Sequence, residues 1–223
     1  MSKILIKRTI TSFALLALVL LMYLNKYFFA SVLIFFGLIS IVEFYFIVKK
    51  IFKKKIYLII SSTFFLTYII ILFLIFYLFS QLNLFKIILF YFLLICIVTD
   101  IGGFVFGKTL KGPKLTKISP NKTISGSTGS LVLSVVIGTI LYSYYINDFV
   151  FKDYGIFIIL TILISTASQL GDLFFSFLKR KAKIKDTGNF FPGHGGILDR
   201  LDGILLGVPT GLILVYIINY LYI

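Results

Sequence analysis

The 223-residue sequence has little acid: eight Asp and Glu residues stand against 22 Lys and Arg residues, for a formal net charge of +14. It has one cysteine, Cys96, which excludes a disulfide framework and a cysteine-based metal site. No small-residue cleavage motif follows the first apolar stretch, so we expect an uncleaved first membrane span.

Hydrophobic residues dominate what is present. They make up 60% of the sequence, and the mean hydropathy of +1.08 lies far above the range of soluble proteins. A membrane-spanning helix needs about 20 apolar residues. The sequence therefore predicts an all-α polytopic membrane protein with about seven transmembrane helices, at residues 9–24, 27–48, 56–79, 84–106, 129–146, 156–178 and 203–222.

The basic residues are distributed unevenly between the predicted loops. Nineteen of the 22 lie at the N-terminus, between the second and third spans, in the loop 107–130 or in the loop 179–202. Because cytoplasmic loops of membrane proteins collect Lys and Arg, this asymmetry predicts a cytoplasmic N-terminus and cytoplasmic long loops. Membrane topology thereby accounts for the positive charge, and nucleic acid is not an expected partner.

Most of the acids lie in predicted spans or at their cytoplasmic ends, whereas Asp148 and Asp153 fall in an outside loop. An ionisable group within a span is costly, so it usually faces a wet or functional interior. For Glu43, a structural pairing with a nearby lysine and a functional role both remain open. The acids near the cytoplasmic side are Glu43, Asp100, Asp172, Asp186, Asp199 and Asp202.

Asp172 lies on a polar stripe of an otherwise apolar helix. Gln169 and Ser176 stand three residues before it and four after it, which places all three on one face. Such a stripe favours an inward-facing site, and an interhelical hydrogen-bond network is the alternative.

Asp199 and Asp202 follow a glycine-rich segment and are spaced so that a helix would present both on one side. With Asp172 they would form an oxygen-rich pocket of the kind that Mg²⁺ prefers. Basic residues beside this pocket would neutralise phosphate oxygens during phosphoryl or nucleotidyl transfer. His194 is either a satisfied loop residue or a hydrogen-bond donor to phosphate. The loop 107–130, rich in Lys, Ser, Thr and Gly, is typical of a phosphate-handling surface or of lipid-headgroup contacts.

The run from Ser176 to Asp202 reads "SFLKRKAKIKDTGNFFPGHGGILDRLD" and combines basic residues, acids and glycines within 27 residues. This run resembles the signature of the phosphatidate cytidylyltransferase (CDP-diacylglycerol synthase) family. The upstream element "SPNKT", Ser119 to Thr123, is similar to the Ser-Pro-x-Lys-Thr element of that family. Ser125 departs from the pattern, since the family usually has Glu at this point, and Ser130 stands where a glycine is common. The matching signature residues are Ser176, Lys179, Arg180, Lys185, Asp186, Gly188, the run Phe191 to Gly196, Leu198, Asp199, Arg200 and Asp202.

The resemblance implies a reaction in phospholipid biosynthesis, in which CMP passes from CTP to phosphatidic acid and yields CDP-diacylglycerol and pyrophosphate. It implies Mg²⁺, alone or with a second cation, bound by Asp172, Asp199 and Asp202. It implies catalytic roles for Asp172, Lys179, Arg180, Lys185, Asp186, His194, Asp199, Arg200 and Asp202, and substrate-binding roles for Ser119, Lys122, Thr123 and Ser176.

The expected organisation follows from these assignments. Residues 1–223 would form a single integral-membrane domain, with amino-terminal helices in 1–80 and a catalytic portion in 84–223. The protein would be multi-pass in the inner (plasma) membrane with its active site facing the cytoplasm, and a homodimer is compatible with this arrangement.

Three other functions remain open. A CTP-dependent prenyl-lipid kinase, or a cytidylyltransferase for another lipid, would use the same residue types. An ion-coupled transporter would also place carboxylates in the membrane, but it would show acids at mid-bilayer and repeated halves. The sequence has no such repeat.

Overall fold

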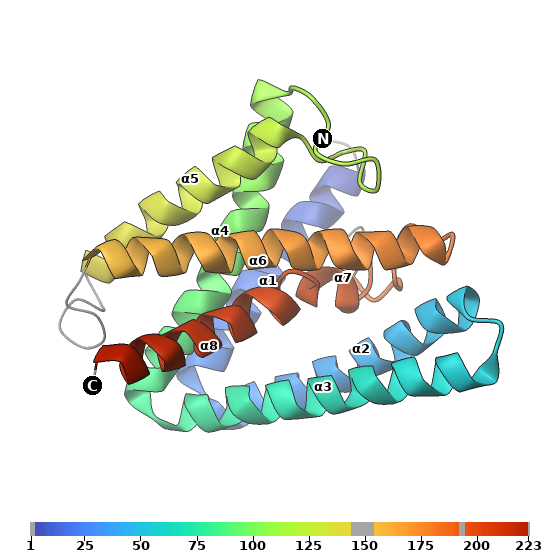
Figure 1. The fold of residues 1–223 in the computed structure, drawn as a ribbon, viewed down its shortest axis with the longest axis horizontal. Helices are drawn as coiled ribbons and strands as arrows, with labels where there is room; N and C mark the ends of the chain where they lie inside the picture. The colour runs from blue at the N-terminus through green and yellow to red at the C-terminus, as the bar shows by residue number, and fades with distance from the viewer. Residues whose placement is uncertain (1–2, 144–153, 192–194, 223) are drawn as a thin grey trace. The chain divides into compact units, whose positions relative to one another are not determined.

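The computed structural model describes residues 3–143, 154–191 and 195–222. Within these ranges the regular elements are helices, joined by loops that contain two isolated antiparallel bridges (Figure 1). The prediction of an all-α protein is confirmed. The helices are α1 (Lys3–Leu24), α2 (Lys26–Ile51), α3 (Lys55–Gln81), α4 (Asn83–Leu110), α5 (Ile124–Leu141), α6 (Tyr154–Lys181), α7 (Leu198–Leu201) and α8 (Ile204–Tyr222).

Six segments of the described chain are long and apolar enough to cross a membrane. Five of them are α2 to α6, and the sixth runs over Leu198–Tyr220. The remaining predicted span, 9–24, falls within α1, whose apolar stretch Phe13–Leu24 is shorter than the other six. The predicted multi-pass architecture is therefore confirmed.

The chain divides into two compact units. One comprises residues 1–85 and 178–201, and the other comprises residues 86–177 and 202–223. The division crosses α6 near its carboxyl end and falls between Leu201 and Asp202.

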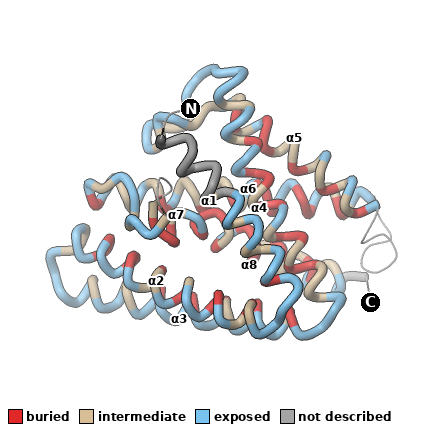
Figure 2. Tube along the Cα trace, turned by 180° about the vertical axis from the view of Figure 1, so that it is seen from behind, coloured by how far each residue is buried: buried red, intermediate tan, exposed pale blue. Residues whose placement is uncertain are grey.

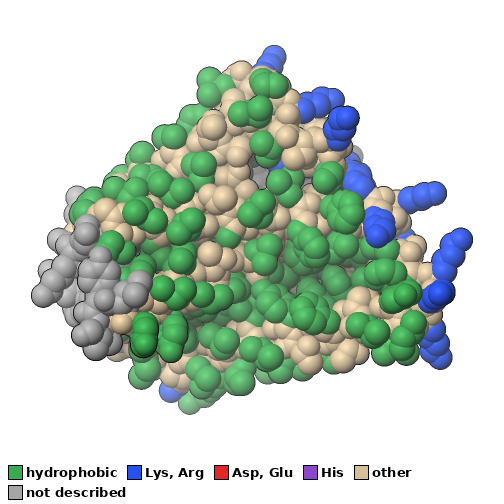
Figure 3. Space-filling model, viewed as in Figure 1, with side chains coloured by type: hydrophobic (Ala, Val, Ile, Leu, Met, Phe, Trp, Pro, Cys, Tyr) green, Lys and Arg blue, Asp and Glu red, His purple; other side chains and the backbone are tan. Residues whose placement is uncertain are grey.

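In the first unit α2 packs against α1, α3 and α7. Helices α2 and α3 form an antiparallel hairpin (Figure 1), in which the ring of Phe44 stacks on that of Phe65 at 3.9 Å between centroids. Basic side chains gather at the turn of this hairpin (Figure 3), where Lys53 and Lys54 separate the two helices. The hairpin thus carries five of its six lysines at or beside this turn, as the loop pattern predicts.

In the second unit buried hydroxyl groups join α4, α5 and α6. Thr99 hydrogen-bonds Ser134 at 2.9 Å and Ser165 at 2.8 Å, and Tyr91 hydrogen-bonds Thr161 at 2.7 Å. Along the long helices buried and exposed residues alternate (Figure 2), and many exposed ones are large and apolar. Polar groups inside and hydrocarbon outside are the arrangement expected of helices that face lipid.

Helix α5 begins earlier than the sequence predicts. The Oγ1 of Thr123 accepts a hydrogen bond from the backbone N–H of Gly126 at 3.1 Å and caps the helix. Residues 124–128, predicted as loop alone, are therefore helical, and α4 runs on to Leu110. The segment is rich in small and hydroxylated residues, as loops often are, but the cap at Thr123 allows a helix to begin here.

Gly171 of α6 lies against the backbone of the segment that follows α7. A Cβ at this position would lie 2.5 Å from the backbone oxygen of Asp202. We expect Gly171→Ala to lower the free energy of unfolding by about 1–3 kcal/mol, because the backbone must shift. The matched control is Gly103→Ala in α4, where a Cβ meets nothing within 4 Å. Thermal unfolding in detergent should separate the two variants, and equal stabilities would contradict the expectation.

Candidate functional site

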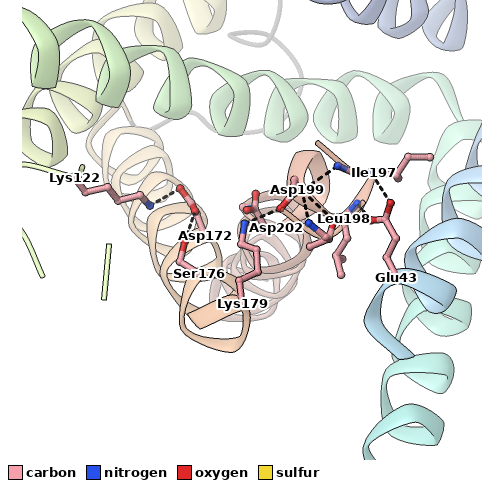
Figure 4. A network of polar contacts seen from close by, with 12 residues as sticks. Glu43, Lys122, Asp172, Ser176, Lys179, Ile197, Leu198, Asp199 and Asp202 are labelled. Atoms are coloured by element: carbon pink, nitrogen blue, oxygen red, sulfur yellow. Dashed lines mark hydrogen bonds and ion pairs between the residues drawn. The ribbon is translucent and has the colours of Figure 1, made fainter. Parts of the chain in front are cut away.

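Asp199 is the centre of a polar cluster in the first unit (Figure 4). Its Oδ1 accepts a hydrogen bond from Nζ of Lys179 at 2.7 Å, and the two side chains form an ion pair that is 13% and 5% exposed for Lys179 and Asp199. Its Oδ2 accepts from the backbone N–H of Thr187 at 2.8 Å, from that of Gly196 at 2.9 Å and from Oγ1 of Thr187 at 3.0 Å. Asp199 therefore holds Lys179 through one oxygen and the preceding loop through the other.

The backbone of this loop turns tightly around Asp199. Gly195 has a φ of +83°, and its carbonyl accepts from the N–H of Phe191 at 2.9 Å. A Cβ on Gly195 would lie 2.6 Å from Oδ2 of Asp199. Both the backbone conformation and the close approach therefore require glycine at this position. The predicted catalytic residue His194 lies outside the described residues.

Glu43 belongs to the same cluster, although the sequence analysis did not place it in the site. Its carboxylate accepts from Oγ1 of Thr187 at 2.7 Å and from the backbone N–H groups of Ile197 at 3.1 Å and Leu198 at 2.8 Å. These partners differ from the lysine considered in the sequence analysis. The signal available was an acid within an apolar helix, which indicates a specific partner without naming it.

A second polar cluster lies in the other unit, around Asp172 of α6 (Figure 4). Oδ2 of Asp172 forms an ion pair with Nζ of Lys122, and Oγ of Ser176 donates to Oδ1 at 3.3 Å. The side chains of Lys122 and Asp172 are 28% and 26% exposed, so the pair remains accessible to a ligand. Three residues predicted for the site are thus brought together.

The loop between α4 and α5 has the geometry that places Lys122. The N–H of Lys122 donates to the carbonyl of Ser119 at 3.1 Å, which closes a turn with Pro120 at its second position. The N–H of Leu115 donates to the carbonyl of Lys122 at 2.8 Å and holds the two sides of the loop together. The Ser-Pro-x-Lys element is therefore a turn that presents one lysine.

Ser125, which departs from the family pattern, has a local partner in this loop. Its Oγ donates a hydrogen bond to the backbone carbonyl of Lys111 and lies 3.1 Å from Oγ1 of Thr123. A glutamate here could not donate to that carbonyl, so the serine contributes to the fold of the loop. Thr123, predicted to bind substrate, has its hydroxyl in the cap of α5.

The residues of the polar stripe on α6 have different partners: Gln169 hydrogen-bonds side chains of α5, and Asp172 pairs with a lysine of the loop before α5. Gln169 donates through Nε2 to Oγ of Ser130 at 2.9 Å, and its Oε1 accepts from Ser127. It thus belongs to an interhelical hydrogen-bond network with α5, the alternative considered for the stripe, whereas Asp172 pairs with Lys122.

Asp202 lies in the turn between α7 and α8 and is 5% exposed. Its Oδ1 accepts from the N–H of Gly203 at 2.9 Å. The single helix that would carry both Asp199 and Asp202 is therefore interrupted, because α7 ends at Leu201. A Cβ on Gly203 would lie 2.6 Å from Oγ of Ser168, and this close approach accompanies the break.

The remaining predicted residues are exposed on the first unit. They carry three positive charges and one negative charge, which suits contact with an anionic ligand. The exposed residues are Arg180, Lys185, Asp186 and Arg200.

Among the residues that the structure describes, no group of three or more His, Cys, Asp or Glu side chains could hold a metal ion.

Comparison with known proteins agrees with the signature. The model of the family described as "Cytidylyltransferase family" matches residues 2–218. The chain belongs to the cytidylyltransferase family. The match includes α2 with Glu43 as well as both polar clusters, so it extends well beyond the residues that carry the resemblance in the sequence.

Individual relatives within the cytidylyltransferase family bear a more specific name. A phosphatidate cytidylyltransferase from Rickettsia bellii is 42% identical over 133 residues, which are 57% of this chain and 56% of the relative. One from Bacillus subtilis is 42% identical over 118 residues, 51% of this chain and 43% of the relative. One from Helicobacter pylori is 35% identical over 127 residues, 57% of this chain and 46% of the relative. The chain thus spans about half the length of the curated relatives it matches.

Proposed function

We propose that the chain is a phosphatidate cytidylyltransferase that transfers CMP from CTP to phosphatidic acid. Membership of the cytidylyltransferase family over residues 2–218 carries this proposal. The relatives named for this activity, at 35% to 42% identity, support the choice of acceptor. Each polar cluster contains a lysine and a carboxylate, which are the kinds of group that the reaction needs.

The proposed reaction joins two anions. A phosphate oxygen of phosphatidic acid attacks the α-phosphorus of CTP, a new P–O bond forms, and the bond to the β-phosphate oxygen breaks, so that pyrophosphate leaves with the electron pair. The lipid phosphate is already an anion near neutral pH, and no strong general base is required. Positioning and charge neutralisation dominate such transfers. Lys179, Arg180 and Lys185 are the cations we assign to phosphate oxygens.

Mg²⁺ is the cofactor that we propose, and the carboxylates differ in how well they fit it. Asp172 fits best, because its side chain is 26% exposed, and a cation bound there would take the place of Lys122. Asp202 offers a second carboxylate but is buried. The oxygens of Asp199 accept from Lys179 and from the backbone N–H groups of Thr187 and Gly196, so a cation there would compete with Lys179. When bound, Mg²⁺ would neutralise phosphate charge and supply Lewis acidity.

The experiment that tests the function uses purified protein with CTP labelled at its α-phosphate, phosphatidic acid and Mg²⁺. We expect labelled CDP-diacylglycerol and unlabelled pyrophosphate in equal amounts. Parallel reactions with a polyprenol or with a polyprenyl phosphate test the neighbouring activities. Product only with a prenyl acceptor, or none with phosphatidic acid, would overturn the proposal.

We propose that the protein lies in the inner membrane and that its site faces the cytoplasm. Because 19 of the 22 basic residues fall on one side of the predicted topology, a reporter fused after Ile223 should be exported, and one fused after Lys185 should stay in the cytoplasm. Activity of alkaline phosphatase and of a fluorescent protein at each position distinguishes the two sides. Residue 185 outside the cell would place the site on the wrong side for CTP.

A further inference from the structure

Glu43 is a buried carboxylate of α2 that holds a loop far away in the sequence. Thr187, Ile197 and Leu198 all donate hydrogen bonds to it, at 2.7 to 3.1 Å. Two of these donors are backbone N–H groups at the start of α7, which have no partner within the helix. In all three contacts Glu43 is the acceptor. A carboxylate has two acceptor oxygens, whereas an amide has only one and a donor NH₂ group in place of the other.

The loop is shaped around this carboxylate. A Cβ on Gly188 would lie 2.5 Å from Oε1 of Glu43, and a Cβ on Gly196 would lie 2.5 Å from its Oε2. Both signature glycines thus leave the space that the carboxylate occupies. Aromatic contacts fix the same loop to α2, since Phe36 meets Phe191 with 6.4 Å between ring centroids. The loop is therefore attached to α2 at two places.

Thr187 connects Glu43 to Asp199. Its Oγ1 lies 2.7 Å from Oε2 of Glu43 and 3.0 Å from Oδ2 of Asp199, while its backbone N–H donates to the same Oδ2. A hydroxyl group has one proton to donate, so Oγ1 of Thr187 donates to one carboxylate at a time, and its shorter contact is with Glu43. The backbone N–H of Thr187 donates to Asp199, so this residue connects the two carboxylates. Asp199 in turn holds Lys179. A continuous chain of contacts thus runs from Glu43 of α2 to Lys179, a basic residue of the signature.

We propose that Glu43 is a positioning residue, which orients Asp199 and Lys179 through Thr187 and the first N–H groups of α7. This inference rests on the proposed function. Glu43 itself contacts protein groups, so its effect on transfer is transmitted through the loop.

The test compares Glu43→Gln with Phe44→Leu, the neighbouring residue of α2. Phe44 stacks on Phe65 of α3 and serves as the matched control for a general loss of stability in this unit. In Glu43→Gln we expect amide hydrogen exchange in peptides covering 195–201 to accelerate by about 10-fold or more, because its amide cannot replace every accepted hydrogen bond. In Phe44→Leu we expect exchange in these peptides to stay within about twofold of wild type.

Activity gives the second readout. We expect kcat to fall by about 10- to 100-fold in Glu43→Gln, and by much less in Phe44→Leu at an equal loss of thermal stability. Thr187→Val should lose as much activity as Glu43→Gln, whereas Thr187→Ser, which keeps the hydroxyl group, should retain wild-type activity. The double variant Glu43→Gln/Thr187→Val should lose little more activity than either single variant.

The inference would be overturned by unchanged exchange at 195–201 in Glu43→Gln, or by a loss of kcat that Phe44→Leu matches at equal stability. Additive losses in the double variant would also do so. A wild-type protein that forms no CDP-lipid would overturn the proposed function instead, while the exchange experiment would still decide whether Glu43 holds the loop.

Discussion

Asp199→Asn is expected to reduce cytidylyl transfer by at least about 100-fold, within the range found when an electrostatic stabiliser is lost. Asparagine keeps one oxygen but replaces the other with an NH₂ donor. It cannot accept from Lys179 and from all three donors of Thr187 and Gly196 at once. The variant therefore loses both the negative charge and the orientation of the loop. Initial rates of CDP-lipid formation at saturating CTP measure the effect.

The control for this variant is Asp153→Asn, which the sequence predicts on the opposite side of the membrane. It should retain wild-type activity, because the predicted topology puts the same chemical change in a loop on the other side of the membrane from the proposed site. An Asp199→Asn protein that is folded, fully active and unchanged in its Mg²⁺ requirement would refute a role for this carboxylate.

Asp172→Asn should also lower activity by about 100-fold, and here the Mg²⁺ dependence separates two roles. If Asp172 binds the metal, Asp172→Asn will raise the Mg²⁺ concentration needed for half-maximal rate, while Lys122→Met will not. If Asp172 serves only its ion pair with Lys122, the two single variants and the double variant will have equal activity and an equal Mg²⁺ requirement. Rates measured over a Mg²⁺ series decide between these outcomes.

The long helices were predictable because the apolar segments are long and the loops between them carry charge. The span predicted at 84–106 lies within α4, and that at 156–178 lies within α6. The start of α5 was not predictable in the same way, since it depends on the hydroxyl of Thr123 rather than on an apolar pattern. Capping acts through one side chain, which hydropathy does not register.

Part of the candidate site also follows from the sequence. The Ser-Pro-x-Lys turn and the stripe on α6 were predicted to contribute to one site, and the structure pairs Lys122 with Asp172. The contact of Glu43 with Thr187 spans 144 residues, and no local pattern encodes a partner at that separation. The break between Asp199 and Asp202 coincides with the close approach of Gly203 to Ser168 of α6, which is likewise a tertiary contact.

The hydroxyl groups that join α4, α5 and α6 have a consequence for biogenesis. Thr99, Ser134 and Ser165 sit in segments that remain apolar enough to insert into a bilayer one at a time. Hydrogen bonds between such side chains contribute about 0.6–2 kcal/mol each within the membrane. Insertion can therefore precede partner choice: the translocon admits each helix on its hydrocarbon content, and the hydroxyls then select which neighbours it keeps.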